Sequence, residues 1–293
     1  DEQNQLAQSL NRKQASWQAM RDFPLDPFRA PVTPFRLPDQ AREDMTKSVS
    51  SLRWLAAEQP VRPSSNDELA FCSIGELAAL LRARLVTSVE LTRLYIERLK
   101  KYDPLLHCVV NLTEELALHQ AAAADREMSR GEFRGPLHGI PWGAKDLISV
   151  PGYPTTWGVP MFAQRVLAEP ATVYQKLTEA GAVLVAKLSL GALAMGDRWQ
   201  GGLTRNPWNP EQGSSGSSAG SASAVAAGLV GFAIGSETLG SILSPCRVCG
   251  STGLRPTFGR VSRAGCMPLS WTMDKLGPIT RTAEDTALVL HAI

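Results

Sequence analysis

The sequence predicts an α/β protein in which helices cover both faces of a mixed, largely parallel central sheet. Segments with apolar residues at helical spacing alternate with short apolar runs of strand length along residues 73–234. Alternation of this kind is typical of strands joined by helical connections. With 293 residues, of which 44% are hydrophobic, the chain is long enough to bury a large core.

Residues 1–70 are predicted to form an N-terminal arm, and residues 71–293 the folded domain. Within the arm, residues 4–20 are compatible with a helix. Most of the rest is interrupted by prolines, at positions 24, 27, 31, 34, 38, 60 and 63. Prolines at this density break helical periodicity, so we expect the arm to lie across a core and to be only partly helical.

Regular structure is predicted to begin at Ser73, where two helix-start signals follow one another. Ser73 with Glu76, and Thr87 with Glu90, match the capping-box pattern of Ser or Thr followed three residues later by Glu. Apolar residues at helical spacing follow both signals. The expected buried stripe of the second helix consists of Leu91, Leu94, Tyr95 and Leu99.

The remaining elements are expected in a regular order. They are a strand at 108–112, a helix at 113–130, a short apolar segment at 139–144, a helix at 171–180, a strand at 182–186, a loop at 201–215, a helix at 218–227 and a strand at 230–234. The last two helices stop at Gly181 and Gly228, and glycine is the residue that most often ends a helix.

Charge and hydropathy exclude several classes of partner. The formal net charge is only +2, which gives no general attraction to nucleic acid or to an acidic membrane. No apolar run approaches the roughly 20 residues that span a bilayer. A soluble protein with a small neutral partner is expected. Because the sequence lacks an initiator Met, the compartment stays open: the cytoplasm is favoured, and export by a cleaved signal is the alternative.

The five cysteines are too few and too uneven in number for a disulfide scaffold. Cys246 and Cys249 form a C-x-x-C pair, but zinc needs a second ligand pair and a redox site needs its own βα context. Reduced thiols, no metal and no cofactor are therefore expected, because dinucleotide and phosphate-binding motifs are also missing from the sequence.

The most informative region is 213–253, which is rich in glycine and serine. By composition alone such a tract is a flexible linker. The apolar run A-V-A-A-G-L-V-G-F-A-I in its middle has no place in a linker and instead indicates a helix followed by a strand. Ser217 would then lie at a helix N-terminus, and Ser241 in the turn after the strand, at the same edge of the sheet.

The turn Thr238–Ser241 offers several backbone N–H groups to one point, which is how an oxyanion hole is built. A serine nucleophile also needs a base. The pattern G-S-S-A-G at 216–220 formally matches a nucleophile elbow and would make Ser218 the nucleophile. That elbow requires a preceding strand and a following acid and histidine, and N-P-W-N-P-E-Q-G is not a strand pattern. Of the four histidines, at 107, 119, 138 and 291, only His291 follows.

Lys145 is the other candidate base. It lies in the apolar segment G-I-P-W-G-A-K-D-L-I, and burial lowers the pKa of a lysine because desolvation disfavours the ammonium form. A neutral amine can accept a proton, so Lys145 could act as a general base.

These residues resemble the amidase signature family from about Phe71 to the end of the chain. The likeness is carried by G-P-L-H-G-I-P-W-G-A-K-D (135–146), E-A-G-A-V-L-V-A-K (179–187), N-P-W-N (206–209), G-S-S-A-G-S-A-S-A-V-A-A-G (216–228), G-S-E-T-L-G-S-I (235–242) and G-L-R-P-T-F-G-R-V-S (253–262).

The resemblance implies a catalytic lysine at Lys145, a cis-peptide shuttle serine at Ser217 and an acyl-forming serine at Ser241. It implies an oxyanion hole from the backbone N–H groups of Thr238, Leu239, Gly240 and Ser241. The implied activity is hydrolysis of a small-molecule amide, with loops such as 194–201 shaping the pocket. The pocket residues named in this way are Ala194, Met195 and Gly196.

Three residues depart from the usual family pattern G-S-D-T-G-G-S-I-R. Glu237, Leu239 and Leu243 stand where it has Asp, Gly and Arg. A guanidinium near the last position pairs with a substrate carboxylate in several members, so its loss disfavours small carboxylate-bearing amides. The family domain also continues well beyond the position of Ile293, and this chain is expected to lack the C-terminal part of the domain.

Three functions follow as hypotheses. The first is a free-standing amidase, which needs no partner protein, with a homo-oligomer left open. The second is the amidase component of a glutamine-dependent tRNA amidotransferase, which needs ATP, charged tRNA and a companion protein; Leu243 and the N-terminal arm argue against it. The third is an inactive fragment with a structural or binding role, which predicts no adduct with a serine-directed probe.

Overall fold

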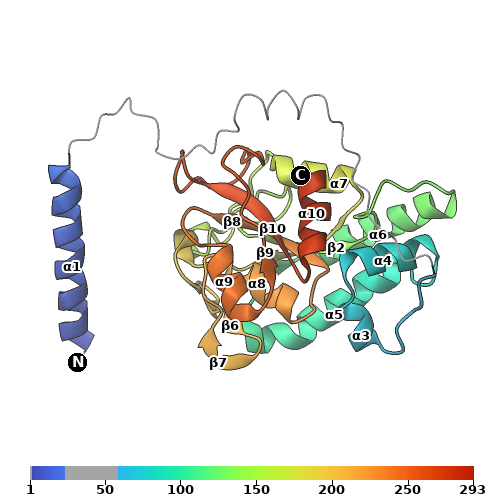
Figure 1. The fold of residues 1–293 in the computed structure, drawn as a ribbon, viewed down its shortest axis with the longest axis horizontal. Coiled ribbons are helices and arrows are strands. Elements are labelled where there is room, and N and C mark those ends of the chain that lie inside the picture. The colour runs from blue at the N-terminus through green and yellow to red at the C-terminus, as the bar shows by residue number, and fades with distance from the viewer. Residues whose placement is uncertain (1, 24–58) are drawn as a thin grey trace. The chain divides into compact units, whose positions relative to one another are not determined.

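The computed structural model describes residues 2–23 and 59–293 (Figure 1). These residues belong to two compact units, with residues 2–23 in one and residues 59–293 in the other. The first contains helix α1 (Glu2–Asp22), where the sequence predicts a helix at 4–20. The expectations for prolines 24 to 38 lie outside the described residues. None of the helices in the described ranges is long and apolar enough to cross a membrane.

The second unit is built on a six-stranded sheet with the order β1-β3-β2-β8-β10-β9. Its strands are β1 (Val109–Leu112), β2 (Pro141–Lys145), β3 (Val183–Leu188), β8 (Phe232–Glu237), β9 (Thr252–Gly253) and β10 (Lys275–Thr280). β2 pairs in parallel with both β3 and β8, whereas β1, β10 and β9 join by antiparallel pairing. The expected α/β class with a mixed sheet is confirmed, and its parallel part is the centre.

The helices connect these strands in the expected alternation. They are α3 (Asn66–Ala70), α4 (Ile74–Arg82), α5 (Ser88–Leu106), α6 (Glu114–Ser129), α7 (Thr172–Glu179), α8 (Ala219–Ala226), α9 (Leu243–Cys249) and α10 (Ala283–Ala292), with short 3-10 turns at Pro160–Phe162 and Ala192–Ala194. The observed bounds fall within a few residues of every helix and strand predicted between 73 and 234.

Both helix-start signals lie at helix N-termini, but of the two only Ser73 with Glu76 forms the complete capping box. Ser73 accepts a hydrogen bond from the backbone of Glu76 while the Glu76 side chain accepts one from the backbone of Ser73, which forms the reciprocal capping box. Thr87 Oγ1 accepts from the Glu90 backbone N–H over 3.0 Å. Each helix therefore begins where a side chain satisfies an otherwise free N–H group.

Apolar side chains leave the central strands alternately toward two hydrophobic clusters, one on each face of the sheet. On β3, Leu184 belongs to the first cluster, whereas Val183 and Val185 belong to the second. On β8, Phe232 and Ala233 divide in the same way. Successive residues of a strand point to opposite faces, so the sheet is buried on both sides, as predicted.

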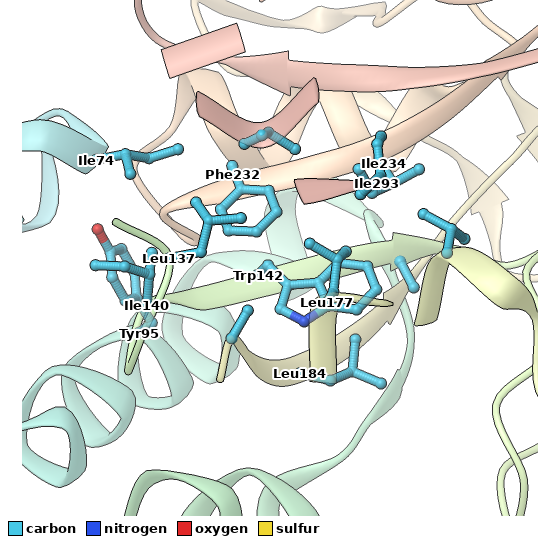
Figure 2. Packing of buried hydrophobic residues seen from close by; sticks show 14 of the residues in the cluster. Ile74, Tyr95, Leu137, Ile140, Trp142, Leu177, Leu184, Phe232, Ile234 and Ile293 are labelled. Atoms are coloured by element: carbon cyan, nitrogen blue, oxygen red, sulfur yellow. The ribbon is translucent and has the colours of Figure 1, made fainter. Parts of the chain in front are cut away.

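Different helices close the two faces. The first cluster takes residues from α4, α7 and α10, and the second from α6, α8 and α9, while the long α5 contributes to both. In the first cluster the rings of Trp142 and Phe232 stack with centroids 6.0 Å apart, with Leu184 and Ile234 nearby (Figure 2). This packing fixes β2 against β8, and both strands end at the candidate site.

The structure also contains elements that the sequence did not predict. Two short two-stranded sheets lie in residues 198–213, although 201–215 was expected as a loop: β4 (Arg198–Trp199) pairs with β5 (Gly202–Leu203), and β6 (Arg205–Asn206) pairs with β7 (Asn209–Gly213). The expectation that no strand precedes residue 216 is therefore wrong. β7 pairs with β6 outside the central sheet. Its sequence, N-P-E-Q-G, lacks residues that favour strands, so we infer that tertiary contacts hold it.

Candidate active site

Lys145 is the last residue of β2, at the edge where the parallel strands end. Its side chain is fully buried. Four oxygen atoms from three serines surround its Nζ: Ser217 Oγ at 2.8 Å, Ser218 Oγ at 3.0 Å, Ser236 Oγ at 2.9 Å and the Ser236 carbonyl oxygen at 3.4 Å. All four are neutral acceptors.

This environment changes the protonation of the amine. Burial lowers the pKa of Lys145 to about 7, because a buried ammonium loses its hydration, while the charges of Asp274 and Glu237 act in the opposite direction. A lysine with such a pKa is neutral in a large fraction of molecules near pH 7. It can therefore accept a proton, as the apolar sequence around it predicts.

Ser217 lies two residues before the first residue of α8, next to the N-cap Ser218, and is only 1% exposed. The peptide bond between Gly216 and Ser217 is cis, the form that the family resemblance assigns to this serine. The Gly191 N–H donates to the Ser217 carbonyl oxygen over 3.3 Å. Ser217 thus has its hydroxyl on Lys145 and its backbone held by a separate loop.

Ser241 lies between β8 and α9 and lines the same cavity as Ser217. Its carbonyl oxygen accepts a hydrogen bond from the Ser218 N–H over 3.0 Å. The turn that carries Ser241 is therefore joined directly to the N-terminal end of α8. Lys145, Ser217 and Ser241, predicted from distant parts of the sequence, come together at one edge of the sheet.

Glu237 organises the turn that follows β8. Its Oε2 accepts hydrogen bonds from the N–H groups of Ile242 and Leu243 at 2.8 and 3.0 Å, and its Oε1 accepts one from Arg255 at 3.1 Å. Burial alone would raise the pKa of Glu237, but the backbone N–H groups of Leu243, Ile242 and Gly240, with Arg255, hold it below the ordinary value. Glu237, longer than the Asp of the family pattern, thus holds the turn as an anion.

Leu239, which replaces a glycine of the family pattern, fits this turn because the left-handed backbone conformation falls on the next residue, Gly240. Gly240 has φ of +81°, in the left-handed region that glycine adopts without cost. Leu239 has no positive φ, and its side chain is 79% exposed. The leucine therefore needs no space inside the turn, and its backbone N–H is preserved.

A cavity of about 380 Å³ opens over these groups. Its lining includes the hydroxyl-bearing residues Ser217, Ser236, Thr238 and Ser241 together with Leu147, Ala194, Leu276 and residues 263–269, 271, 274 and 275. A volume of this size suits a small molecule. Hydroxyl-bearing, charged and apolar side chains all contribute to the lining.

The predicted pocket residues Ala194, Met195 and Gly196 lie in a loop packed against Ser217. Ala194 lines the cavity, whereas the Met195 side chain is 71% exposed. A Cβ atom on Gly216 would lie 1.8 Å from the Gly196 carbonyl oxygen, and one on Gly191 would lie 2.0 Å from it. The two backbones approach so closely that only glycine fits at these positions.

Residues 263–274 form part of the cavity wall, and Asp274 holds this part in place. Its Oδ1 accepts from Thr238 Oγ1 over 2.5 Å, and its Oδ2 accepts from the N–H groups of Leu269 and Ser270 at 2.6 and 2.8 Å. Arg263 donates to the Ser270 carbonyl oxygen over 3.3 Å. These bonds connect this part of the wall to the Thr238–Ser241 turn.

A buried ion pair involves Asp146, the residue that follows Lys145 in the chain. Asp146 Oδ1 is 2.7 Å from Lys187 Nζ, and neither side chain is exposed. Lys187 also donates to the Pro154 carbonyl oxygen and to Thr155 Oγ1, both at 3.0 Å. Asp146 Oδ2 accepts from the N–H and hydroxyl of Thr156 at 2.9 and 2.6 Å. The pair joins β2, β3 and the 154–156 loop, and the sequence indicated a role for neither residue.

The elbow interpretation of Ser218 does not fit the arrangement. The strand that precedes it, β7, belongs to a two-stranded ribbon outside the central sheet, and the Ser218 side chain is fully buried. His138 is buried beside Glu127, with Nε2 3.0 Å from Oε2, and none of the four histidines, which all lie in the part of the chain that the structure describes, lines the cavity. Ser218 therefore has neither access to the cavity nor a histidine base.

The cysteines form no visible site of their own. Cys246 and Cys249 both lie on α9 as free thiols, and burial raises their pKa to about 11 and about 12. Within residues 2–23 and 59–293, His, Cys, Asp and Glu side chains form no group of three or more that could hold a metal ion.

Sequence comparison connects this arrangement to known proteins. A family described as Amidase matches residues 90–293. A glutamyl-tRNA(Gln) amidotransferase component from Moorella thermoacetica is 42% identical over 229 residues, which make up 77% of this chain and 47% of the relative. The protein of the same name from Methylococcus capsulatus is 44% identical over 222 residues, 75% of this chain and 46% of the relative. The chain thus spans about half the length of these curated relatives.

Solved structures give the same result for the fold. The native peptide amidase of Stenotrophomonas maltophilia matches with a TM-score of 0.72 and 40% identity, over 75% of this chain and 47% of that one. A bacterial aryl acylamidase matches with a TM-score of 0.71 and 29% identity, over 76% of this chain and 47% of that one.

Proposed function

The chain belongs to the amidase signature family, and from that premise we propose that it hydrolyses a carboxylic amide to an acid and ammonia or an amine. The observation that carries the proposal is the contact of a buried lysine, whose pKa is about 7, with Ser217 at 2.8 Å. Ser217 and Ser241 line a cavity of the size of a small molecule.

The proposed reaction begins with a proton relay. Neutral Lys145 takes the proton of the Ser217 hydroxyl, Ser217 takes that of Ser241, and Ser241 Oγ attacks the amide carbonyl carbon. The proton returns through the same groups to the nitrogen of the leaving amine. Water then enters, loses a proton to the relay and cleaves the ester, which releases the acid and restores Ser241. The relay needs only side chains and water.

The negative charge that forms on the carbonyl oxygen needs donors fixed before the reaction. We propose that backbone N–H groups of the Thr238–Ser241 turn provide them, because Glu237, Asp274 and Gly240 hold this turn in one conformation. Each such donor is worth on the order of 3 kcal/mol of transition-state stabilisation.

The second candidate is a component of a glutamine-dependent amidotransferase, the function in the names of the curated relatives. A glutaminase site must hold the carboxylate of glutamine. At the position where the family pattern has an Arg, this chain has Leu243, which is 40% exposed. This favours the free-standing amidase. The third candidate, an inactive fragment, predicts that Ser241 does not react.

A serine-directed fluorophosphonate probe, followed by mass spectrometry of the modified peptide, tests the proposal on the purified chain. We expect an adduct on Ser241 that disappears in Ser241→Ala and forms much more slowly in Lys145→Ala. An adduct on Ser218 would restore the elbow mechanism, and a folded protein without an adduct would support the inactive fragment. Release of ammonia from glutamine, compared with release from neutral amides, separates the first two candidates.

A further inference from the structure

Ser218 occupies the N-cap position of α8, but its hydroxyl does not cap the helix. A serine at an N-cap normally accepts a hydrogen bond from a backbone N–H of the first turn, and this contact stabilises the helix. Here the side chain points to Lys145 and to β8 instead. Because the Ser218 hydroxyl does not cap α8, we expect it to have a role in its contacts with Lys145 and Ser236.

The hydrogen bonds of Ser218 Oγ define that use. It donates its single hydrogen to the Ser236 carbonyl oxygen over 3.0 Å and accepts from the Ser236 N–H over 3.1 Å. A hydroxyl has one hydrogen and two acceptor positions. Only one acceptor position is left for Lys145, 3.0 Å away. Ser218 can therefore accept from the amine but cannot donate to it.

This restriction bears on the direction of the lysine lone pair. A neutral amine has two hydrogens and one lone pair, and three hydroxyls lie within 3.0 Å of Lys145 Nζ: those of Ser217, Ser218 and Ser236. We propose that Ser218 and Ser236 are positioning residues that accept the two N–H bonds of neutral Lys145 and so aim its lone pair at Ser217. The inference rests on the proposed function, because it assigns these roles within the Lys145 relay.

The same three oxygens also suit the protonated state. Once Lys145 has taken the proton of Ser217, its ammonium group has three hydrogens and three hydroxyl acceptors. Hydrogen bonds to a charged donor are stronger than those to a neutral one, so Ser218 and Ser236 favour the ammonium form. Loss of either acceptor should therefore lower the pH at which Lys145 titrates.

Other charges near the amine are few and differently placed. Glu237 from β8 and Asp274 before β10 both raise the pKa of Lys145. On β3, Lys187 is paired with Asp146. The hydrogen bonds of Glu237, Asp274 and the Asp146–Lys187 pair go to residues other than Ser218 and Ser236, so neither serine variant removes one of them. The effect of the serines can thus be measured separately.

The test is the rate of fluorophosphonate labelling of Ser241 between pH 5 and 9 in Ser218→Ala and Ser236→Ala. We expect the rate at high pH to fall about tenfold in each variant, since general-base catalysis as a whole contributes 10²–10⁴-fold. The inflection should move to lower pH by about one unit, because a hydrogen bond to an ammonium is lost.

Ser221→Ala is the matched control. Ser221 is buried on the same helix, and its hydroxyl donates to a carbonyl of the same strand, that of Ile234 at 3.3 Å. It does not contact Lys145. We expect this variant to keep the inflection and the rate of the wild type while losing thermal stability to a similar degree as Ser218→Ala.

Each outcome decides the question. A lower rate with an unchanged inflection would show that Ser218 has only a structural role and would overturn the inference. A faster rate in Ser236→Ala would overturn it too, because Ser236 would then compete for the lone pair. If Ser218→Ala does not fold, Ser236→Ala still gives the answer, since it keeps both backbone bonds to Ser218. Wild-type protein without a Ser241 adduct would instead contradict the proposed function.

Discussion

Asp146 and Lys187 form an ion pair inside the protein, with 2.7 Å between Oδ1 and Nζ and no exposed surface on either side chain. Asp146 follows Lys145 directly in the chain, and Lys187 belongs to the neighbouring parallel strand. Burial lowers the pKa of Lys187, whereas the charge of Asp146 raises it. The pair therefore holds the strand end that carries Lys145, and its two charges depend on one another.

We expect Lys187→Met to lower the free energy of unfolding by about 3 kcal/mol, because the charge of Asp146 is then left buried without its partner. The double variant Asp146→Asn with Lys187→Met should cost clearly less than the sum of the two single changes. Urea denaturation of the four proteins measures the coupling. Additivity within about 0.5 kcal/mol would show that the two charges act independently.

The reactivity of Ser241 should depend on pH through Lys145. Because the pKa of Lys145 is about 7, the neutral base becomes the main form as the pH rises through that value. The labelling rate should therefore increase from pH 5 to pH 8 with an inflection near 7. Lys145→Arg should be slow and independent of pH over this range, since a guanidinium stays protonated. An inflection that survives in Lys145→Arg would exclude Lys145 as the base.

Lys145 should also limit stability. Its pKa is lowered in the folded protein, from 10.5 to about 7, so the unfolded chain binds more protons between these values. The unfavourable contribution is complete below pH 7 and vanishes above pH 10.5. We expect Lys145→Met to raise the free energy of unfolding by on the order of 2 kcal/mol at pH 6 and by less at pH 9. Urea denaturation at both pH values checks the sign; an equal gain at both would contradict it.

The Thr238–Ser241 turn should tolerate a substitution at Leu239 and resist one at Gly240. Gly240→Ala places a side chain at φ of +81°, which we expect to cost about 1–2 kcal/mol and to slow labelling of Ser241. Leu239→Ala shortens a side chain that is 79% exposed and should change stability by less than about 0.5 kcal/mol. Thermal unfolding of both variants measures the difference, and a larger loss for Leu239→Ala would mean that the leucine packs against the turn.

The alternation of helices and strands could be predicted from the sequence because local signals and burial agree. Gly181 ends α7 and the apolar run behind it becomes β3, so periodicity alone located both. The ribbon β6–β7 could not be found in this way. It is held by contacts with residues distant in sequence: Asn206 Nδ2 donates to the Val248 carbonyl oxygen over 3.3 Å, and Ser223 Oγ donates to the Arg205 carbonyl oxygen over 2.8 Å. β10 also went unpredicted, because Gly277 and Pro278 interrupt its apolar run.

The site was predicted unevenly for a similar reason. Burial of Lys145 follows from its apolar neighbours, but its contact with Ser217, 72 residues away in sequence, was carried by the family resemblance. Ser236 and Lys187 gave a weaker signal: each is a polar or charged residue that lies just after a predicted strand, 230–234 or 182–186, with no partner visible in the sequence. Their partners become apparent only when β2, β3 and β8 lie side by side.

The glycines of the serine-rich tract have a consequence for anyone who wishes to make this protein more heat-resistant. Replacing glycine by alanine restrains the unfolded chain and is among the safer general routes to a more robust protein. A methyl group on Gly216 would meet the Gly196 carbonyl oxygen at 1.8 Å, and one on Gly220 would meet the Cys108 carbonyl oxygen at 2.4 Å. That route is closed around the serines, so an engineered library should leave this tract untouched and draw its diversity from outward-facing helix positions.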